Sequence, residues 1–142
     1  MIDADLVIRK MSLIGPDLGK IITLAAKDLE HYLADATLED LAERYLERAI
    51  GRMIDINYHL ITELGEPPPP DCYDSFLKLG AMGILPVDLA RRVASCAGLR
   101  NRIAREYDTL DPVLMHGGLK AAARDIPEYL RYIESYLTSA VH

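Results

Sequence analysis

Aromatic residues and cysteines are scarce in this sequence. Of its 142 residues, 6% are aromatic, one is phenylalanine and none is tryptophan. Leucine, isoleucine, alanine and valine must therefore build the core, a composition that suits packed helices. The two cysteines, Cys72 and Cys96, form no metal-ligand cluster, and we expect them to be reduced thiols. The length predicts a single domain over 1–142, with a core that needs neither disulfides nor metals.

Long apolar runs and a basic leader segment are also missing. No uninterrupted apolar run approaches the roughly 18 residues that a membrane span needs. Met1 is followed by two aspartates within four residues instead of a positively charged stretch. We therefore expect a soluble, cytoplasmic protein that makes no contact with membranes. No glycine-rich phosphate loop or dinucleotide fingerprint occurs either, and we expect no cofactor and no metal site.

Apolar residues recur at helical spacing almost throughout the chain, and strand-period alternation with hairpin turns does not occur. The pattern predicts an all-α bundle of about five helices, with an apolar surface that makes a homodimer plausible. The expected helices cover a short segment over 6–13 followed by 18–33, a long helix over 38–64, a short one over 71–82, one over 86–107 and a last one over 119–137.

Helix-breaking and capping residues set these expected boundaries. Gly15-Pro16 either separates the first two segments or kinks one continuous helix. Thr37 and Asp71 are expected to cap the helices that follow them, and residues 67–70, all proline, form a rigid connector. Gly117-Gly118 is expected to form a turn, and Pro127 to kink the last helix or to mark its true start.

Charge is distributed unevenly along the chain. There are 16 Lys and Arg against 22 Asp and Glu, a formal net charge of -6. Nevertheless, one predicted helix contains five arginines, at positions 91, 92, 100, 102 and 105. A local cationic surface on an anionic protein suggests a site for a phosphate-bearing partner. The alternative is a solvated helix face that acidic neighbours balance.

Four side chains in this helix are expected to form one polar, cationic side. With about 100° between successive helical residues, Tyr107 lies nearly above Arg100, and Asn101 and Arg105 lie on the adjacent strip. Arginine forks hold phosphate oxygens in pairs, and Asn101 can hydrogen-bond a ribose or a base edge. The cluster can bind phosphate, hold RNA, or present Tyr107 for modification.

The segment 100–107, RNRIAREY, resembles the signature of the HepT-like branch of the HEPN superfamily. That signature is Arg-Asn, three mostly apolar or basic residues, His, any residue and Tyr. Residues 41–59 resemble the long helix of the family, and the tail around Tyr129, Ile133 and Tyr136 fits its final helix. The resemblance covers most of the chain in helix order and length, and the Arg-Asn motif is its specific part.

The resemblance implies a homodimeric helical bundle in which both copies of the motif line the dimer cleft. It implies a metal-independent endoribonuclease toxin that acts on RNA, such as tRNA or mRNA. Its antitoxin would be a minimal nucleotidyltransferase of the MNT type, which silences the toxin by transferring AMP units to the motif tyrosine. By position, Arg100 would hold the scissile phosphate, Asn101 would orient the substrate and Tyr107 would accept AMP. Asp55 matches a polar position that faces the motif.

Arg105 stands where the family has histidine. Arginine does not deprotonate in proteins, so it cannot be the general base, although it can stabilise charge on a pentavalent phosphate. Three outcomes remain open: a weakened or inactive nuclease that keeps its RNA site, a nuclease that uses Asp55 or His59 as its titrating group, or a binding or regulatory partner of a nucleotidyltransferase. Asp55 and His59 share a helix face, and an ordinary surface ion pair is the alternative for them.

Overall fold

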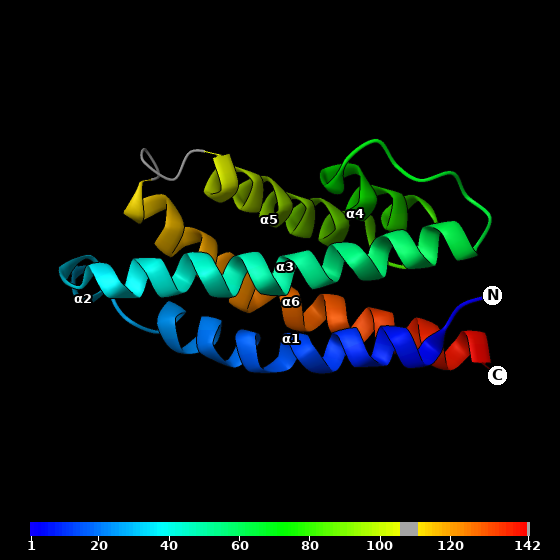
Figure 1. Cartoon of the computed structure of the whole chain (residues 1–142), viewed down its shortest axis with the longest axis horizontal. Coiled ribbons are helices and arrows are strands. Elements are labelled where there is room, and N and C mark those ends of the chain that lie inside the picture. The colour runs from blue at the N-terminus through cyan, green and yellow to red at the C-terminus, as the bar shows by residue number, and fades with distance from the viewer. Residues whose placement is uncertain (106–110, 142) are drawn as a thin grey trace.

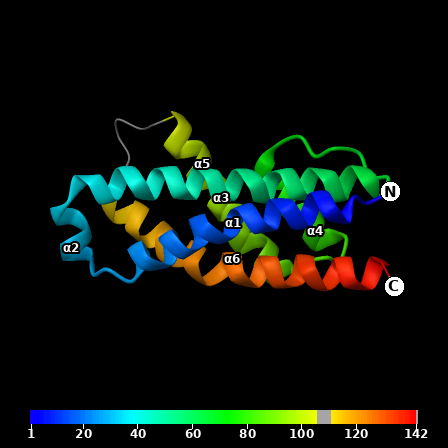
Figure 2. The same ribbon diagram turned by 60° about the horizontal axis from the view of Figure 1, so that its bottom comes forward.

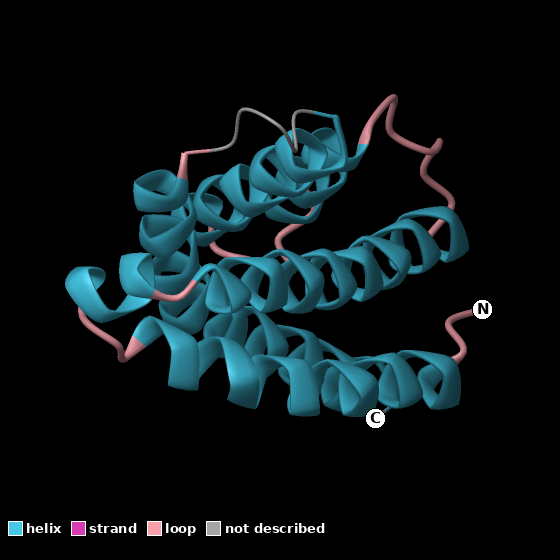
Figure 3. Ribbon diagram, turned by 60° about the vertical axis from the view of Figure 1, so that its left-hand side comes forward, coloured by secondary structure: helices cyan, strands magenta, loops and turns pink. Residues whose placement is uncertain are grey.

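The computed structural model describes residues 1–105 and 111–141, with the backbone alone at 103–105 and 141. Within these ranges the chain forms helices and no strand (Figure 3), which confirms the expected all-α fold. The helices are α1 (Ala4–Ala25), α2 (Leu29–Ala34), α3 (Ala36–Glu63), α4 (Cys72–Ala81), α5 (Val87–Arg105) and α6 (Pro112–Val141). None of the described helices is apolar over a length that would reach across a lipid bilayer.

Three long helices, α1, α3 and α6, run alongside one another and form the body of the bundle (Figures 1 and 2). The shorter α4 and α5 pack on each other and cover α3 and α6 on one side, while α2 lies at the end where α3 begins. Both chain termini lie at the opposite end (Figure 2). This arrangement places α5, the arginine-rich helix, directly against α3.

The first helix continues through Gly15-Pro16, so a break at this point was the wrong alternative. Pro16 has no N–H and cannot bond the carbonyl of Ser12. The neighbouring carbonyl, that of Leu13, accepts a hydrogen bond from Arg52 Nη1 of α3 at 3.1 Å, which supports this turn from outside. The helix ends instead at Ala25, and α2 begins where the Asp28 carboxylate accepts from the His31 amide at 2.8 Å.

The last helix begins earlier than the sequence predicted, so the expected turn at Gly117-Gly118 and the alternative start at Pro127 were both wrong. Asp111 accepts from the Val113 amide at 2.9 Å, and the helix runs without interruption through Gly117-Gly118 and Pro127. The glycines therefore form no turn. Gly118 instead allows close packing, because a Cβ at this position would clash with Leu99 Cδ2 of α5.

The remaining boundaries agree closely with the predicted ones. The prediction that Thr37 caps α3 was wrong: the cap is Asp35, whose carboxylate accepts from the Thr37 amide at 3.0 Å, and Thr37 lies in the first turn. Asp71 caps α4 as predicted. Gly65 and Gly83 follow α3 and α4 with φ of 84° and 78°, a backbone region that favours glycine. The expected end of α5 near Tyr107 lies outside the described residues.

The core contains one buried polar network that ties three helices together. Tyr129 of α6 is fully buried, and its hydroxyl donates to Asn57 Oδ1 of α3 at 2.6 Å. Asn57 Nδ2 in turn donates to Ser75 Oγ of α4 at 3.1 Å. Buried polar groups need such partners, so this network fixes the register of α3 against α4 and α6.

Candidate functional site

Arg100 extends from α5 onto the surface of α3. Its side chain is half-buried and lies over Gly51: a Cβ built on Gly51 would be 3.7 Å from Arg100 Nε and 3.8 Å from Nη2. The Nε–H is buried and finds no hydrogen-bond acceptor among the described residues. Because a buried donor without a partner is costly, this guanidinium keeps an unused capacity to bind an anion.

Asn101 follows directly on α5 and is also half-buried. Within the described ranges, neither its side chain nor that of Arg100 forms a hydrogen bond or an ion pair with the protein. The Arg-Asn pair thus presents a cation and an amide that the surrounding protein leaves available.

The rest of the motif is described in part. Arg102 is exposed, and Arg105 is the last described residue of α5, with its backbone helical. Tyr107 lies outside the described residues. That Arg100, Asn101, Arg105 and Tyr107 share one side of the helix therefore stays a prediction.

One arginine of the expected cationic surface is neutralised by the protein itself. Arg92 bonds Asp88 at 2.6 Å, Asp125 at 3.1 Å and Glu128 at 3.0 Å. Asp125 is 1% exposed and also bonds Arg124 at 2.8 Å. Arg92 therefore joins α5 to α6, and the cationic surface is smaller than the count of arginines suggested.

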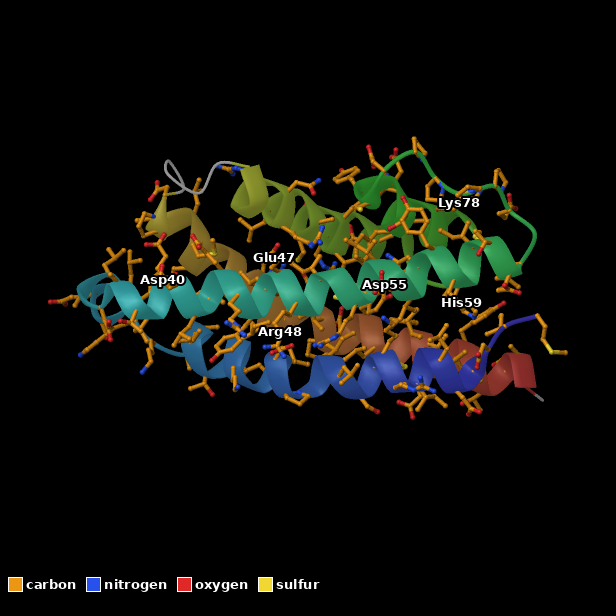
Figure 4. The ribbon with its side chains drawn as sticks, in the orientation of Figure 1. Asp40, Glu47, Arg48, Asp55, His59 and Lys78 are labelled. Atoms are coloured by element: carbon orange, nitrogen blue, oxygen red, sulfur yellow. The ribbon has the colours of Figure 1, made fainter. Side chains whose placement is uncertain are left out.

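Asp55 and His59 bond the amino-terminal part of the chain. Asp55 Oδ2 accepts from Lys10 Nζ of α1 at 3.1 Å, and His59 Nε2 accepts from the Asp3 amide at 3.0 Å. Figure 4 shows both residues on α3, in the half nearer the chain termini. Their described bonds run to residues 3 and 10, and no described bond joins either residue to Arg100 or to the other.

The arginines of α3 also turn toward α1. Arg44, Arg48 and Arg52 recur at every fourth residue, a spacing typical of a salt-bridged exposed stripe, but Arg48 and Arg52 lie 3.5 Å and 2.8 Å from the carboxylate of Asp17. Asp17 is 2% exposed, so these contacts form a partly buried ion pair between α1 and α3. Figure 4 shows Arg48 on the α1 side of α3.

Sequence reasoning missed two features of α3 near Arg100: Gly51 itself and an acidic edge that precedes it. The sequence signal that could have identified Gly51 is its position in the middle of a strongly helical segment, where a glycine lowers the stability of the helix. Glu47 lies one turn before Gly51 and is exposed. Burial raises the pKa of Glu43, and the charges of Glu39, Asp40 and Glu47 raise it further. These carboxylates repel one another, and among the described residues they form no ion pair with Arg100.

The fold and the Arg-Asn pair on α5 together define a HEPN-type helical protein. The family described as Ribonuclease HepT-like matches residues 16–135. This chain therefore belongs to the HepT-like family, and the resemblance inferred from the segment 100–107 is confirmed.

Particular relatives agree with this assignment. The tRNA nuclease HepT of Aphanizomenon flos-aquae (strain 2012/KM1/D3) is 33% identical over 128 residues, which cover 90% of this chain and 87% of the relative. Among solved structures, a tri-AMPylated Shewanella oneidensis HEPN toxin in complex with MNT antitoxin superposes with a TM-score of 0.83 at 23% identity, over 92% of this chain and 98% of that one. YutE from Bacillus subtilis, a cytosolic protein of unknown function, superposes with a TM-score of 0.82 at 14% identity, over 98% and 93%. The two structures show the shared fold.

Proposed function

We propose that this protein is an endoribonuclease toxin that cleaves RNA without a metal ion at a site containing Arg100 and Asn101. The observation that carries the proposal is the half-buried Arg100 guanidinium, whose Nε–H has no acceptor among the described residues. A phosphodiester supplies the missing negative charge and acceptor oxygens. The 33% identical relative is named a tRNA nuclease, which supports RNA as the substrate.

In the proposed reaction, the 2′-oxygen of the RNA attacks the adjacent phosphorus and the bond to the 5′-oxygen breaks. Negative charge grows on the phosphoryl oxygens, and Arg100 stabilises it, while Asn101 hydrogen-bonds the nucleotide. Arg105 can add positive charge, but it has no lone pair for a proton near neutral pH. The proton of the 2′-hydroxyl therefore passes to water or to another side chain, and the departing 5′-oxygen takes up a proton.

We further propose that a nucleotidyltransferase of the MNT type neutralises this activity. The phenol oxygen of Tyr107 would attack the α-phosphorus of ATP, so that AMP is transferred and pyrophosphate leaves. The AMP phosphate would then compete with RNA for Arg100. A neighbour in fold, the AMPylated HEPN toxin bound to MNT antitoxin, supports this partner.

RNA cleavage by purified protein tests the nuclease. We expect the wild type to cleave single-stranded RNA or tRNA in the presence of EDTA, and Arg100→Ala to lower the rate about a hundredfold or more. Arg91→Ala, which removes an exposed arginine two and a half turns earlier on α5, is the matched control and should cleave as the wild type does. Equal rates for wild type and Arg100→Ala would contradict the proposal.

A second candidate function is a catalytically degenerate HEPN dimer that binds and regulates a nucleotidyltransferase. The arginine at position 105, where the family has histidine, favours it, because histidine titrates near neutral pH and arginine does not. The Arg105→His variant separates the two functions. Activity in Arg105→His that the wild type lacks would identify the natural protein as a degenerate nuclease.

Intact mass tests the modification. After incubation with ATP and the partner enzyme, the wild type should gain the mass of one or more AMP units, and Tyr107→Phe should gain none. An increment that survives in Tyr107→Phe would rule out this tyrosine as the sole acceptor.

A further inference from the structure

We propose that Gly51 is a positioning residue for Arg100: its missing side chain leaves the space on α3 in which the guanidinium rests. The inference rests on the function proposed above, because it assigns a role in the same RNA site to a residue on a different helix.

Backbone geometry does not require glycine at position 51. The residue lies inside a 28-residue helix, and its φ is not in the positive region where glycine is favoured. Glycine in a helix interior is less favourable than alanine, so α3 is less stable than it would be with alanine here. A reason other than the conformation of α3 is needed.

The described surroundings of Gly51 point to Arg100. Among the described residues, the atoms within 4 Å of a Cβ built on Gly51 are Nε and Nη2 of Arg100. At 3.7 Å and 3.8 Å these are ordinary van der Waals distances, so alanine fits. A leucine side chain would extend further in the same direction and would occupy the volume of the guanidinium.

This contact explains how Arg100 is both half-buried and unpaired. The guanidinium lies beside the helix at a position where no side chain projects, and the carboxylate of Glu47, one turn earlier, is not within ion-pair distance. A cation held in one place and left without a counter-ion is pre-organised for a phosphate, because little ordering remains to be done on binding. Displacement by a larger side chain would lose this arrangement and leave the fold intact.

Two substitutions at Gly51 test the proposal, and both favour the helix. Gly51→Ala should keep RNA cleavage within about twofold of the wild type and unfold at the same or a higher temperature. Gly51→Leu should lower kcat about tenfold or more and weaken binding of a non-cleavable 2′-deoxy-substituted RNA, with little change in the unfolding temperature. Full activity in Gly51→Leu would overturn the proposal.

The same substitutions in an Arg100→Ala background separate positioning from a general structural role. If Gly51 acts through Arg100, Gly51→Leu should cause no further loss in cleavage or binding once the guanidinium is absent. An equal loss in both backgrounds would overturn the proposal. If the wild type does not cleave RNA, the proposed nuclease function fails, and binding of the 2′-deoxy-substituted RNA decides the role of Gly51 alone. Weaker binding by Gly51→Leu and Arg100→Ala supports it, and unchanged binding by Gly51→Leu overturns it.

Discussion

Individual arginines of this chain differ mainly in which carboxylates neutralise them. Arg92 bonds three acidic side chains, and Arg52 bonds the buried Asp17. Arg100 bonds none among the described residues and has a buried Nε–H without an acceptor. Identical residue types thus join helices in the first two cases, and in the third the guanidinium keeps the capacity to bind an anion on which the proposed function rests. The sequence shows five arginines on one helix but does not show which of them meet acids from other helices.

The two cysteines should differ strongly in reactivity. Burial raises the pKa of the Cys96 thiol to about 12, and the nearby Asp125 adds to the shift, whereas Cys72 is half-buried. At about pH 8 the Cys96 thiol is neutral, and thiols react as thiolates. We expect iodoacetamide to modify Cys72 in the folded protein and to modify Cys96 only after unfolding in guanidinium chloride, as mass spectrometry of peptides will show.

The Cys72→Ser variant provides the control for this experiment. It should take up no label when folded and one label when unfolded. Rapid labelling of folded Cys72→Ser would mean that α5 and α6 open around Cys96 more easily than their packing indicates.

At the level of helices, local breaking signals predicted some boundaries and failed at others. Gly65 and Gly83 end helices because their φ values are positive. Gly15-Pro16, Gly117-Gly118 and Pro127 lie inside helices. The difference has a long-range cause: Arg52 supports the carbonyl near Pro16, and Leu99 packs against Gly118. Such contacts join segments far apart in the sequence, so local propensity cannot reveal them.

Two helical glycines should respond to alanine in opposite directions. Gly19 of α1 is exposed, and a Cβ there would meet nothing within 4 Å, so Gly19→Ala should stabilise the fold by about 1 kcal/mol. Gly80 of α4 is buried, and its Cβ would lie 2.8 Å from the Cβ of Ala90, so Gly80→Ala should destabilise by about 1–3 kcal/mol. Urea unfolding of both variants measures the difference. Equal stabilities would contradict the close α4–α5 packing.

The acidic edge of α3 should make stability depend on pH. The pKa of Glu43 is raised in the folded state by burial and then by neighbouring carboxylates, so its ionised form destabilises the fold at neutral pH. This penalty is present above the folded pKa and disappears as the pH falls below 4.5, the ordinary pKa of a glutamate side chain. We expect Glu43→Gln to unfold at a higher temperature than the wild type at neutral pH.

The advantage of Glu43→Gln should shrink on acidification and vanish near pH 4, at about the unfolded-state pKa of glutamate. Glu134→Gln, which neutralises an exposed residue of α6, serves as the charge-matched control and should show a smaller advantage at neutral pH. A Glu43→Gln variant that is less stable than the wild type at neutral pH would show that this carboxylate has a stabilising partner.

For the whole molecule, the sequence predicted the fold class and the family, because these depend on helical periodicity and on one short motif, whereas the role of the Arg-Asn pair stays a prediction. It did not predict the role proposed for Gly51, because that role depends on the side chain of Arg100, which reaches α3 from α5. That Asp55 faces the motif stays a prediction, and the sequence did not show that Lys10 of α1 binds its carboxylate. Residues within one element can be assigned from sequence, and contacts between elements require the structure.

The functional unit should be a pair of chains. Arg100 supplies one guanidinium per chain, and the HepT-like resemblance implies that two copies of the motif line one cleft. Sedimentation should therefore give twice the 15.8 kDa of a single chain.

Co-expression of differently tagged wild-type and Arg100→Ala chains then allows mixed dimers to be purified. If one cleft uses both copies of Arg100, a mixed dimer should cleave RNA at far less than half the wild-type rate, because the phosphate charge loses one of its two cations. Mixed dimers of wild type with Gly19→Ala should keep full activity, since that position is exposed and has no contact to lose. A fully active species of one chain, or a mixed dimer with half the wild-type rate, would show that each chain works alone.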